Sequence, residues 1–415
     1  MIRFYNFLLF CLNPFINLYL RKRKKIGKED LENFDQRLGK FKCARPAGKL
    51  IWIHAVSVGE SLSIIPLVNE LCEREQLNIL VTSTTVTSAK LIKERIHKKA
   101  FHQFLPIDKK SYVQNFLNYF KPDLAILVES ELWPNLINET AKQKIPLILL
   151  NARISPKTGF EWFCYRFFAK NLLKKFALIL PQEQDQLAIL QQLKATNIKY
   201  IGNLKRAAPA LPYEQTELAK LQKLYAPYKI FLAASTHPGE EEIITTSYAR
   251  LRQKIPELRL IIVPRHPVRG ADLAAEFSKD FQLVSRSKHT DLAGVPELYL
   301  ADTLGELGLF YQLADYALIG GSLVDIGGHN PLEALKANCL PLSGNYIKNF
   351  KIIYQELLEE QASFLGDINE LEELIIKLNQ EQKLLKEYQD NCQKVAKADQ
   401  QIMAEAIEII KSRIK

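Results

Sequence analysis

The sequence predicts an α/β protein with two doubly wound domains, each built on a parallel sheet. Its 415 residues correspond to two or three domains at about 150 residues per domain. Hydrophobic residues make up 47% and charged residues 25%, an ordinary globular mix that excludes disordered, collagen-like and polytopic membrane chains. From residue 48 onward, short β-branched runs alternate with amphipathic stretches, and this rhythm starts again after a proline-containing linker. Such alternation is typical of βαβ units.

Six apolar runs in the first half predict the strands of an N-terminal domain. Most are almost continuously apolar, as expected for strands that are buried on both faces of a parallel sheet. The expected strands are Leu50–Val56, Asn78–Ser83, Ala125–Glu129, Ile145–Asn151, Ala177–Pro181 and Lys199–Gly202. The amphipathic stretches between them predict helices in right-handed crossovers.

Six further runs predict the strands of a C-terminal domain. These are Lys229–Ser235, Leu258–Pro264, Phe281–Ser285, Leu298–Ala301, Tyr316–Gly320 and Leu340–Ser343. The stretch Arg206–Pro212 is the expected linker, which gives domain limits of 26–206 and 213–385, with terminal helices over 386–415. We expect the domains to face each other across a cleft, because ligands of doubly wound folds bind at the carboxyl ends of the strands.

Residues 1–25 form a separate N-terminal segment, in which an apolar stretch precedes a basic run. Residues 4–20 read FYNFLLFCLNPFINLYL, and one helix of that length would span roughly 26 Å, slightly less than a ~30 Å hydrocarbon core. Asn13 and Pro14 interrupt the stretch, so a helix that lies on the membrane, one that spans it and a buried core helix all remain interpretations. The positive-inside rule places the run Arg21–Lys25 on the cytoplasmic face.

The net charge of +10 is concentrated in this segment, where residues 1–25 hold six basic residues and no acidic ones. Because the excess lies beside an apolar stretch, it favours attraction to anionic lipid headgroups, at about 1 kcal/mol per basic residue, over nucleic-acid binding. The six cysteines have no C-x-x-C spacing, and no metal-ligand cluster is evident in the sequence. We therefore expect no metal, no cofactor and no nucleic-acid partner.

The turn Ser57–Ser61, between the first expected strand and the helix after it, carries the first candidate catalytic residue. Gly59 permits a tight backbone, and Glu60 falls near the helix N-terminus. One interpretation is structural, a first-turn glutamate favoured by the helix dipole, and spacing alone favours it. The other is a carboxylate base that faces the cleft and is held ionised by the dipole.

Glu129 emerges directly from an apolar strand, a position that structural need does not readily explain. A carboxylate there is either paired with a base or used in chemistry. The segment Asn151–Arg153, after the following strand, is one candidate source of the partner. Lys205, at the end of the first half, is either a contact for an anionic substrate or a solvated loop lysine.

Two motifs in the second half point to phosphate. Arg265 and His266 lie between two prolines at the carboxyl end of a strand, where an arginine suits a bidentate phosphate contact. The stretch Gly320–Glu333 contains two Gly-Gly pairs, which let a backbone approach a ligand closely. It is neither a Walker P-loop nor a G-x-G-x-x-G fingerprint, so a nicotinamide cofactor is not expected.

The end of this stretch predicts a capped helix start whose exposed N–H groups bind phosphate. Asn330 is the expected cap, Pro331 the first helical residue and Glu333 the partner in a capping box. By contrast, Ser235–Glu242 is explained as a helix start, because a serine or threonine that precedes a proline and three acidic residues is typical of a helix N-terminus.

With these motifs the chain resembles the 3-deoxy-D-manno-octulosonic acid (Kdo) transferases of lipopolysaccharide synthesis, inverting glycosyltransferases of family 30 with the GT-B fold. The matching segments are Arg37–Gly39, Ile53–Ser61, Glu129–Asn135, Asn151–Arg153, Gly202–Lys205, Ser235–Glu241, Pro264–Pro267, Asp302–Leu307 and Gly320–Glu333. The chain departs from the family pattern at Arg206-Ala207, where Phe-Asp is usual, and at Gly344-Asn345, where Gly-Pro is usual.

The resemblance implies two Rossmann-like domains behind a membrane-associated N-terminal helix. It implies CMP-Kdo as the donor and lipid IVA, a lipid A precursor in the inner membrane, as the acceptor. Glu60 would be the general base, and Glu129 and Lys205 transition-state stabilisers. The CMP site would comprise Arg265, His266, Leu304, Gly305, Glu306, Asn330, Pro331, Leu332 and Glu333. A GT-B transferase with another nucleotide sugar, and a membrane-tethered binding module, are the alternatives.

Overall fold

A computed structural model describes residues 2–154, 169–207, 209–288, 292 and 294–414. The chain divides into two units: unit 1 comprises Met1–Ala208 with Asp399–Lys415, and unit 2 comprises Pro209–Ala398. The division falls within the expected linker. The last helix, α17 (Gln382–Arg413), does not form a separate segment, because its residues from Asp399 onward group with unit 1.

Unit 1 is built on a six-stranded parallel sheet in the order β3-β2-β1-β4-β5-β6. Its strands are β1 (Leu50–His54), β2 (Asn78–Ser83), β3 (Ala100–Phe104), β4 (Leu124–Val128), β5 (Leu147–Ala152) and β6 (Leu178–Pro181). Its helices after the N-terminal segment are α3 (Phe34–Arg37), α4 (Val58–Glu73), α5 (Val86–Arg95), α6 (Lys110–Phe120), α7 (Pro134–Lys142), α9 (Asp185–Gln192) and the 3-10 turn η1 (Leu204–Ala207). This strand order is that of a doubly wound nucleotide-binding fold.

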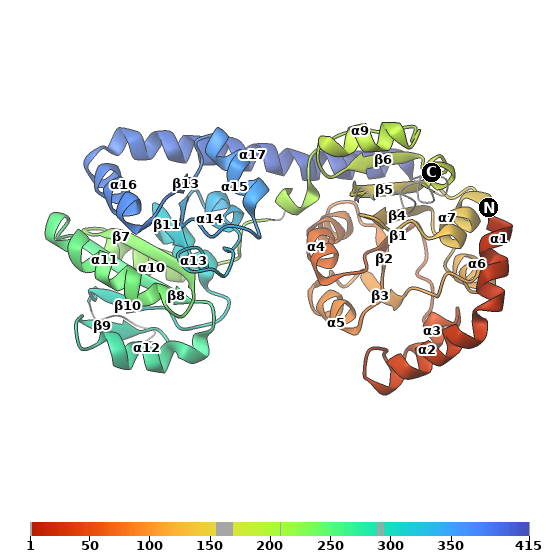
Figure 1. Cartoon of the computed structure of the whole chain (residues 1–415), viewed down its shortest axis with the longest axis horizontal. Coiled ribbons are helices and arrows are strands. Elements are labelled where there is room, and N and C mark those ends of the chain that lie inside the picture. The colour runs from red at the N-terminus through yellow and green to blue at the C-terminus, as the bar shows by residue number, and fades with distance from the viewer. Residues whose placement is uncertain (1, 155–168, 208, 289–291, 293, 415) are drawn as a thin grey trace. The chain divides into compact units, whose positions relative to one another are not determined.

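Apolar residues on both faces of this sheet explain its burial. Ile51 and Ile53 of β1 pack in a core with α4, α5 and the end of α17, whereas Leu50 and Trp52 pack in a second core with α6 and α7. Figure 1 shows α4 and α5 on one side of the strands and α6 and α7 on the other. Side chains alternate between the faces of a strand, so a run that is apolar throughout must be covered twice.

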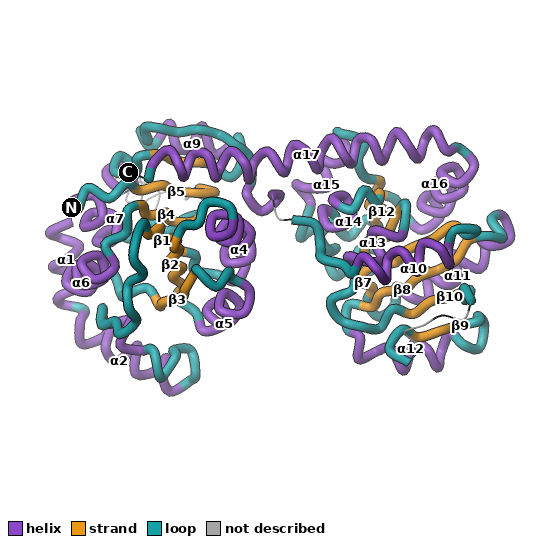
Figure 2. Tube along the Cα trace, turned by 180° about the vertical axis from the view of Figure 1, so that it is seen from behind, coloured by secondary structure: helices purple, strands orange, loops and turns teal. Residues whose placement is uncertain are grey.

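Unit 2 is built on a seven-stranded parallel sheet in the order β13-β12-β11-β7-β8-β10-β9. Its strands are β7 (Lys229–Thr236), β8 (Leu258–Pro264), β9 (Leu283–Ser285), β10 (Leu298–Leu300), β11 (Tyr316–Ile319), β12 (Leu340–Ser343) and β13 (Phe364–Leu365). Its helices besides α17 are α10 (Gln215–Tyr225), α11 (Glu240–Lys254), the 3-10 turn η2 (Pro267–Arg269), α12 (Gly270–Phe277), α13 (Leu307–Leu313), α14 (Leu332–Lys336), α15 (Lys351–Glu359) and α16 (Ile368–Gln380). Helices cover both faces of the strands (Figure 2), with α11, α12 and α16 on one and α10 and α13 on the other.

In each sheet the strand order reverses beside the first strand. In unit 1 this reversal lies between β1 and β4, and in unit 2 it lies between β7 and β11. Ligands of such sheets bind outside the carboxyl ends of the strands at the reversal. The loops after β1, β4, β7 and β11 are therefore the first places to look for function.

Two strands escape the sequence prediction and one predicted strand does not form. The edge strand β3 is mostly buried, but its sequence contains His102 and Gln103 and so lacks the continuous apolar run that predicts a buried strand. The edge strand β13 has only two residues. The predicted strand Lys199–Gly202 lies outside the sheet, and Gly202 has φ +100°, where an added Cβ would come within 2.6 Å of the Ile402 side chain. Contact with α17 therefore shapes this segment.

The N-terminal segment folds as two short helices, α1 (Ile2–Cys11) and α2 (Asn13–Lys25), with Pro14 in the first turn of the second. In the described part of the chain, no helix combines the length and the apolar character needed to cross a membrane. α1 has no buried residue, so the interpretation as a core helix is wrong. Large apolar side chains of both helices are exposed, among them Phe4, Phe7, Phe10, Phe15 and Leu18.

Candidate active site

Glu60 lies in the first turn of α4, directly after β1. Its carboxylate accepts hydrogen bonds from the Val56 N–H at 2.8 Å and from the Ser57 hydroxyl at 2.8 Å, while Ser57 caps the helix by accepting from the Glu60 N–H. Only 8% of the residue is exposed. The interpretation of Glu60 as a structural residue at the helix start therefore accounts for the contacts that its carboxylate makes here. Each carboxylate oxygen retains a second lone pair that can accept a hydrogen bond from another donor.

The pKa of Glu60 is shifted in the direction opposite to the one that the helix dipole alone would give. Burial raises the pKa of Glu60, the hydrogen bonds from Val56 and Ser57 oppose this effect, and the charges of Glu129 and Glu131 raise the pKa further. A carboxylate with a raised pKa accepts a proton more readily, which suits a general base.

Glu129 and Lys205, which are 76 positions apart in the sequence, form an ion pair in the structure. The Lys205 Nζ lies 2.5 Å from the Glu129 Oε1, with 37% and 14% of the two side chains exposed. The partner of Glu129 is therefore Lys205, and the expectation that Asn151–Arg153 supplies it is wrong. Glu129 also adopts φ +58°, an unfavourable backbone conformation for a residue with a side chain. Such strain is typical of functional sites.

Asn151 has a different role from the one expected, because it holds the turn that carries Lys205. It adopts φ +56° where the register between β5 and β6 shifts, and its Oδ1 accepts a hydrogen bond of 3.0 Å from the Leu204 N–H. The residue is 1% exposed. The neighbouring departure from the family pattern, Arg206, binds the buried Asp399 of α17 at 2.8 Å. Both contacts hold the η1 turn, which carries Lys205, in place.

Sequence reasoning gave no role to His54 and Glu131, which lie beside these residues. The His54 Nε2 lies 3.7 Å from the Glu131 Oε2, and His54 is fully buried at the end of β1. The Glu131 Oε2 also accepts a hydrogen bond from the indole N–H of Trp133, a side chain that is 41% exposed. A histidine at the end of an apolar run was the available signal, since a buried imidazole requires partners.

In unit 2 the candidate CMP residues Arg265 and His266 follow β8, and both are exposed. His237, after β7, and His329, after β11, meet beside them with their Nε2 atoms 2.7 Å apart and their rings stacked. Burial, together with the neighbouring His237 and Arg265, lowers the pKa of His329 to about 4. His237 was explained as part of a helix start, so the sequence analysis missed this pair.

The glycine-rich segment uses its first Gly-Gly pair internally. The carboxylate of Glu240, which is fully buried, accepts hydrogen bonds from the N–H groups of Gly321, Ser322 and Leu323. An added Cβ at Gly320 would come within 2.3 Å of the Ser235 carbonyl oxygen. These glycines thus serve close packing and a carboxylate of the protein, which corrects the expectation that they admit a ligand.

The residues at the end of this segment form only part of the predicted helix start. The Asn330 Oδ1 accepts a hydrogen bond of 3.2 Å from the Leu332 N–H, but Pro331 is the cap residue and α14 has five residues. Glu333 does not complete a capping box, since its side chain bonds with that of Asn330. Burial raises the pKa of Glu333, and Lys336, Asn330 and Arg265 oppose this effect.

The third expected CMP segment follows β10. Leu304 is 81% exposed and Gly305 has φ +85°, so this loop presents its backbone to solvent. The Glu306 carboxylate is paired with the guanidinium of Arg286 at 2.6 Å, and this bond holds the pKa of Glu306 below its usual range. The Glu306 side chain therefore anchors the loop to the domain.

The sequence of this chain is similar to the sequences of known proteins. A family model described as 3-deoxy-D-manno-octulosonic-acid transferase (kdotransferase) matches residues 32–208. The chain is 37% identical to the 3-deoxy-D-manno-octulosonic acid transferase of Rickettsia bellii, over 99% of each chain. It is 33% identical to the protein of the same name from Haemophilus influenzae, over 86% of each. The chain belongs to the Kdo transferase family.

Membership of the Kdo transferase family makes the chain a glycosyltransferase that transfers Kdo. Among solved structures, it is similar to the UDP-GlcNAc 2-epimerase of Neisseria meningitidis bound to UDP-GlcNAc, with a TM-score of 0.54 and 15% identity over 88% of this chain and 99% of that one. The similarity at this identity concerns the fold. Together with the two parallel sheets it confirms the predicted fold class, two Rossmann-like domains of the GT-B type.

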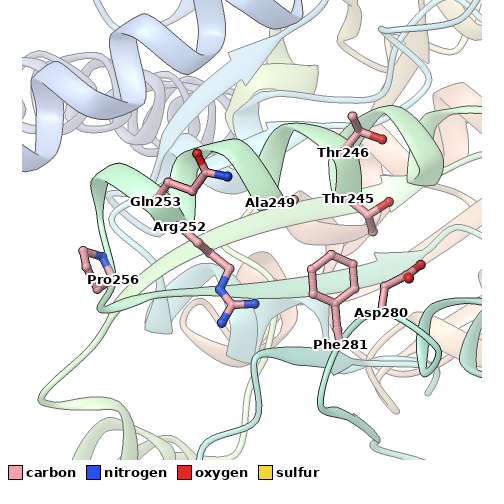
Figure 3. Close-up of a pocket in the computed structure, with 8 residues that line it drawn as sticks. All are labelled: Thr245, Thr246, Ala249, Arg252, Gln253, Pro256, Asp280 and Phe281. Carbon is pink, nitrogen blue, oxygen red and sulfur yellow. The ribbon is translucent and has the colours of Figure 1, made fainter.

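The structure of this Kdo transferase also has a cavity that lies apart from the candidate site. An open cavity of about 680 Å³ runs along α11 (Figure 3), lined among others by Arg252, Pro256 and Phe281. Pro256 precedes β8 and Phe281 precedes β9, so the cavity lies near the amino ends of these strands, opposite the edge where ligands bind. Among the described residues, no group of three or more His, Cys, Asp or Glu is placed to hold a metal ion.

Arg269 belongs to the same motif as Arg265, but we expect it to act on stability. Its guanidinium lies 2.6 Å from the Glu241 carboxylate, which is fully buried. Arg269→Gln should lower the free energy of unfolding by about 3 kcal/mol, because it leaves a buried carboxylate without its cation. Urea unfolding measures this. The control is Arg250→Gln, which breaks the more exposed pair with Glu372 and should cost less than about 1 kcal/mol. Equal losses would contradict the prediction.

Proposed function

We propose that the chain transfers Kdo from CMP-Kdo to lipid IVA with inversion, and that Glu60 is the general base. In this reaction the oxygen of an acceptor hydroxyl forms a bond to the anomeric carbon of Kdo. The bond from that carbon to the CMP phosphate breaks, and CMP leaves with the bonding electron pair. The hydroxyl proton passes to the Glu60 carboxylate.

The observation that supports this mechanism best is the convergence of Glu60, Glu129 and Lys205 at the strand-order reversal of unit 1. Glu60 comes from the first turn of α4, Glu129 from the end of β4 and Lys205 from η1, and Lys205 is in direct contact with Glu129. The charge of Glu129 also acts on Glu60. In the proposal, this ion pair stabilises charge that develops in the transition state, as fixed cations and hydrogen-bond donors commonly do.

In the proposal, CMP binds to unit 2 at the carboxyl ends of β7, β8, β10 and β11. The N–H groups of Gly321–Leu323 already bind Glu240, so the charge of the leaving phosphate falls to the exposed Arg265 with His266. Residues 304–306 and 330–333 complete the CMP site. Glu333, which has its carboxylate beside Asn330, is suited to hold a ribose hydroxyl.

We also propose that unit 1 lies on the anionic cytoplasmic face of the inner membrane. The exposed aromatic side chains of α1 and α2 and the basic run Arg21–Lys25 are the features of a helix that lies in the interface. A lipid acceptor would be reached from that position. Nucleic acid is not part of the proposal.

The direct test is incubation of the purified full chain with CMP-Kdo and lipid IVA. We expect release of CMP and a lipid whose mass has risen by one or more Kdo residues, measured by mass spectrometry. Displacement of CMP-Kdo by a UDP-sugar, with transfer of that sugar to the lipid, would contradict the proposed donor. Transfer to a water-soluble acceptor alone would contradict the proposed acceptor.

The raised pKa of Glu60 gives a test by pH. A base must be deprotonated, so kcat/KM should fall as the pH drops through this pKa, which is raised above the ordinary value of a glutamate. Glu131→Gln removes one of the charges that raise this pKa, and the acidic limb should move to lower pH. Glu70→Gln, farther along α4, is the control and should leave the limb in place. A limb that moves equally in both variants would contradict the assignment.

Arg265 is expected to act on the donor. Arg265→Gln should raise the KM for CMP-Kdo by about 10- to 100-fold, the usual contribution of a hydrogen bond to a charged group. Steady-state kinetics at a saturating lipid concentration measures it. Because Arg265 is exposed, the unfolding midpoint should stay unchanged. An unaltered KM for the donor would remove Arg265 from the CMP site.

A further inference from the structure

A cavity of about 580 Å³ lies between α1 and the start of α6, and the proposed reaction gives it no role. One wall is a face of α1 with Arg3, Asn6, Leu9 and Phe10, and Asn13 of α2 continues it. The opposite wall is Lys109, Lys110, Ser111 and Gln114. Figure 1 shows α1 on the outer side of α6 and α7, away from the sheet.

The cavity lining carries three positive charges, from Arg3, Lys109 and Lys110, and no acidic residue. Among the described residues, none of these three cations lies within 4.0 Å of a carboxylate oxygen. The Lys109 Nζ contacts the Asn13 Oδ1 at 3.5 Å and lies over the Tyr112 ring at 5.0 Å from its centroid, and neither partner carries a negative charge. Three cations kept together without a direct ion pair complement an anion.

The nearby carboxylates are engaged elsewhere. Asp108 is buried and accepts hydrogen bonds from the Tyr5 hydroxyl at 3.0 Å and from two N–H groups at the start of α7. Glu139 is held by Lys142 at 2.6 Å and by Gln114 at 2.8 Å. Both carboxylates have hydrogen-bonding partners of their own, although the charge of Lys110 also acts on Glu139 from a distance.

The same cavity has an apolar side that opens onto the apolar surface of the N-terminal helices. Leu9 and Phe10 line it, and Phe10 is 79% exposed. Phe7, at 62% exposed, lies one turn before Phe10 on α1. A ligand that fits such a lining combines an anionic group with hydrocarbon, as an amphiphile does.

Polar contacts fix α1 in place, so the cavity is part of the folded domain. Besides the bond from Tyr5 to Asp108, the Asn135 Nδ2 donates to the Asn6 Oδ1 at 2.8 Å. These bonds join α1 to the start of α7, the helix that follows Glu131 and Trp133.

We propose that this cavity binds the phosphate headgroup of an anionic bilayer phospholipid, with the acyl chains along Leu9 and Phe10. This proposal rests on the membrane association proposed above and adds a discrete, saturable site to it. The exposed basic residues Arg21, Lys22 and Lys25 supply general attraction to the surface, whereas Arg3, Lys109 and Lys110 bind one headgroup.

The test compares two triple variants of the full chain with equal charge change. Arg3→Gln/Lys109→Gln/Lys110→Gln should weaken binding of soluble dihexanoylphosphatidylglycerol by about 100-fold, at about fivefold for each charge. Arg21→Gln/Lys22→Gln/Lys25→Gln should leave that binding unchanged. Both variants should bind less to vesicles of phosphatidylcholine with phosphatidylglycerol, and wild type should not bind dihexanoylphosphatidylcholine measurably. Phe10→Ala should weaken binding of the short-chain lipid and leave inorganic phosphate unaffected.

Several outcomes would overturn this site. The first is that the Arg3→Gln/Lys109→Gln/Lys110→Gln variant binds the short-chain lipid as tightly as wild type does. The second is that wild type binds inorganic phosphate as tightly as it binds the lipid. The third is that the short-chain lipid competes with lipid IVA in the transfer assay. The last would assign the cavity to the acceptor. If wild type does not bind the vesicles, that result would instead contradict the proposed membrane association itself. All altered residues are partly or fully exposed, and matching thermal unfolding of the variants would show that folding is retained.

Discussion

Glu60→Gln is expected to lower kcat by about 1,000-fold, within the range by which a positioned general base accelerates proton transfer. The glutamine cannot take the proton of the acceptor hydroxyl. Its carbonyl oxygen can still accept a hydrogen bond from the Val56 N–H or the Ser57 hydroxyl, the two donors that hold the carboxylate. The start of α4 should therefore keep its geometry. CMP release from CMP-Kdo in the presence of lipid IVA measures the loss.

The control for this substitution is Glu70→Gln, in the same helix but paired with Arg74 on the surface. It should keep wild-type activity. The KM for CMP-Kdo should stay near the wild-type value in both variants, because the proposed donor residues belong to unit 2. Equal rates of CMP release in wild type and Glu60→Gln would refute the proposed base and return Glu60 to the capping role that its contacts describe.

The central strands could be predicted from the sequence because burial on both faces leaves a plain apolar signature. The limits of β2, β8 and β12 agree with the predicted runs. The edge strand β3 carries His102, whose ring bonds with the Ser83 hydroxyl at 2.9 Å, and an edge strand tolerates such polar residues. No local pattern separates a strand of this kind from a loop. Conversely, Lys199–Gly202 has the right composition for a strand but does not continue beside β6 after the bond from the Lys199 N–H to the Ile179 carbonyl, and Gly202 packs closely against Ile402 of α17.

The candidate sites show a similar division between local and distant information. Loops after strands in a doubly wound sheet converge at one edge, so the neighbourhood of Glu60 and Glu129 followed from the strand assignments alone. Which residues touch there depends on side-chain geometry across the fold. The pairing of Glu129 with Lys205 rather than Arg153, and of His237 with His329, lay beyond any spacing rule.

The glycine-rich segment shows how one motif supports two physical interpretations. Gly-Gly pairs and a helix start indicate a close approach of the backbone, and that approach exists. Its partners are Glu240 and the backbone of Ser235 rather than a ligand. Glu240 follows proline and glycine at the start of a helix, a position that its local sequence explains completely. Only the fold shows its second role.

The second large effect is expected at Lys205. Lys205→Met should lower kcat by about 100- to 1,000-fold if the ammonium stabilises the transition state, as removal of one such group commonly does. Lys199→Met is the matched control, since its ion pair with Glu405 is exposed and belongs to the same unit. That variant should keep its activity. A Lys205→Met enzyme with normal kcat would show that the lysine only neutralises Glu129.

Glu129→Gly separates the chemical role of this pair from its structural cost. Glycine adopts a positive φ without penalty, so the substitution should relieve strain of about 1 kcal/mol at the φ of +58° while it removes the carboxylate. We expect unfolding stability within about 1 kcal/mol of wild type and kcat reduced about 100-fold. In the double variant with Lys205→Met, the two losses should not multiply, because each residue acts through contact with the other. Fully multiplicative losses would show that the two residues act separately. Retained activity in Glu129→Gly would mean that this position supplies the positive-φ backbone conformation and not the carboxylate.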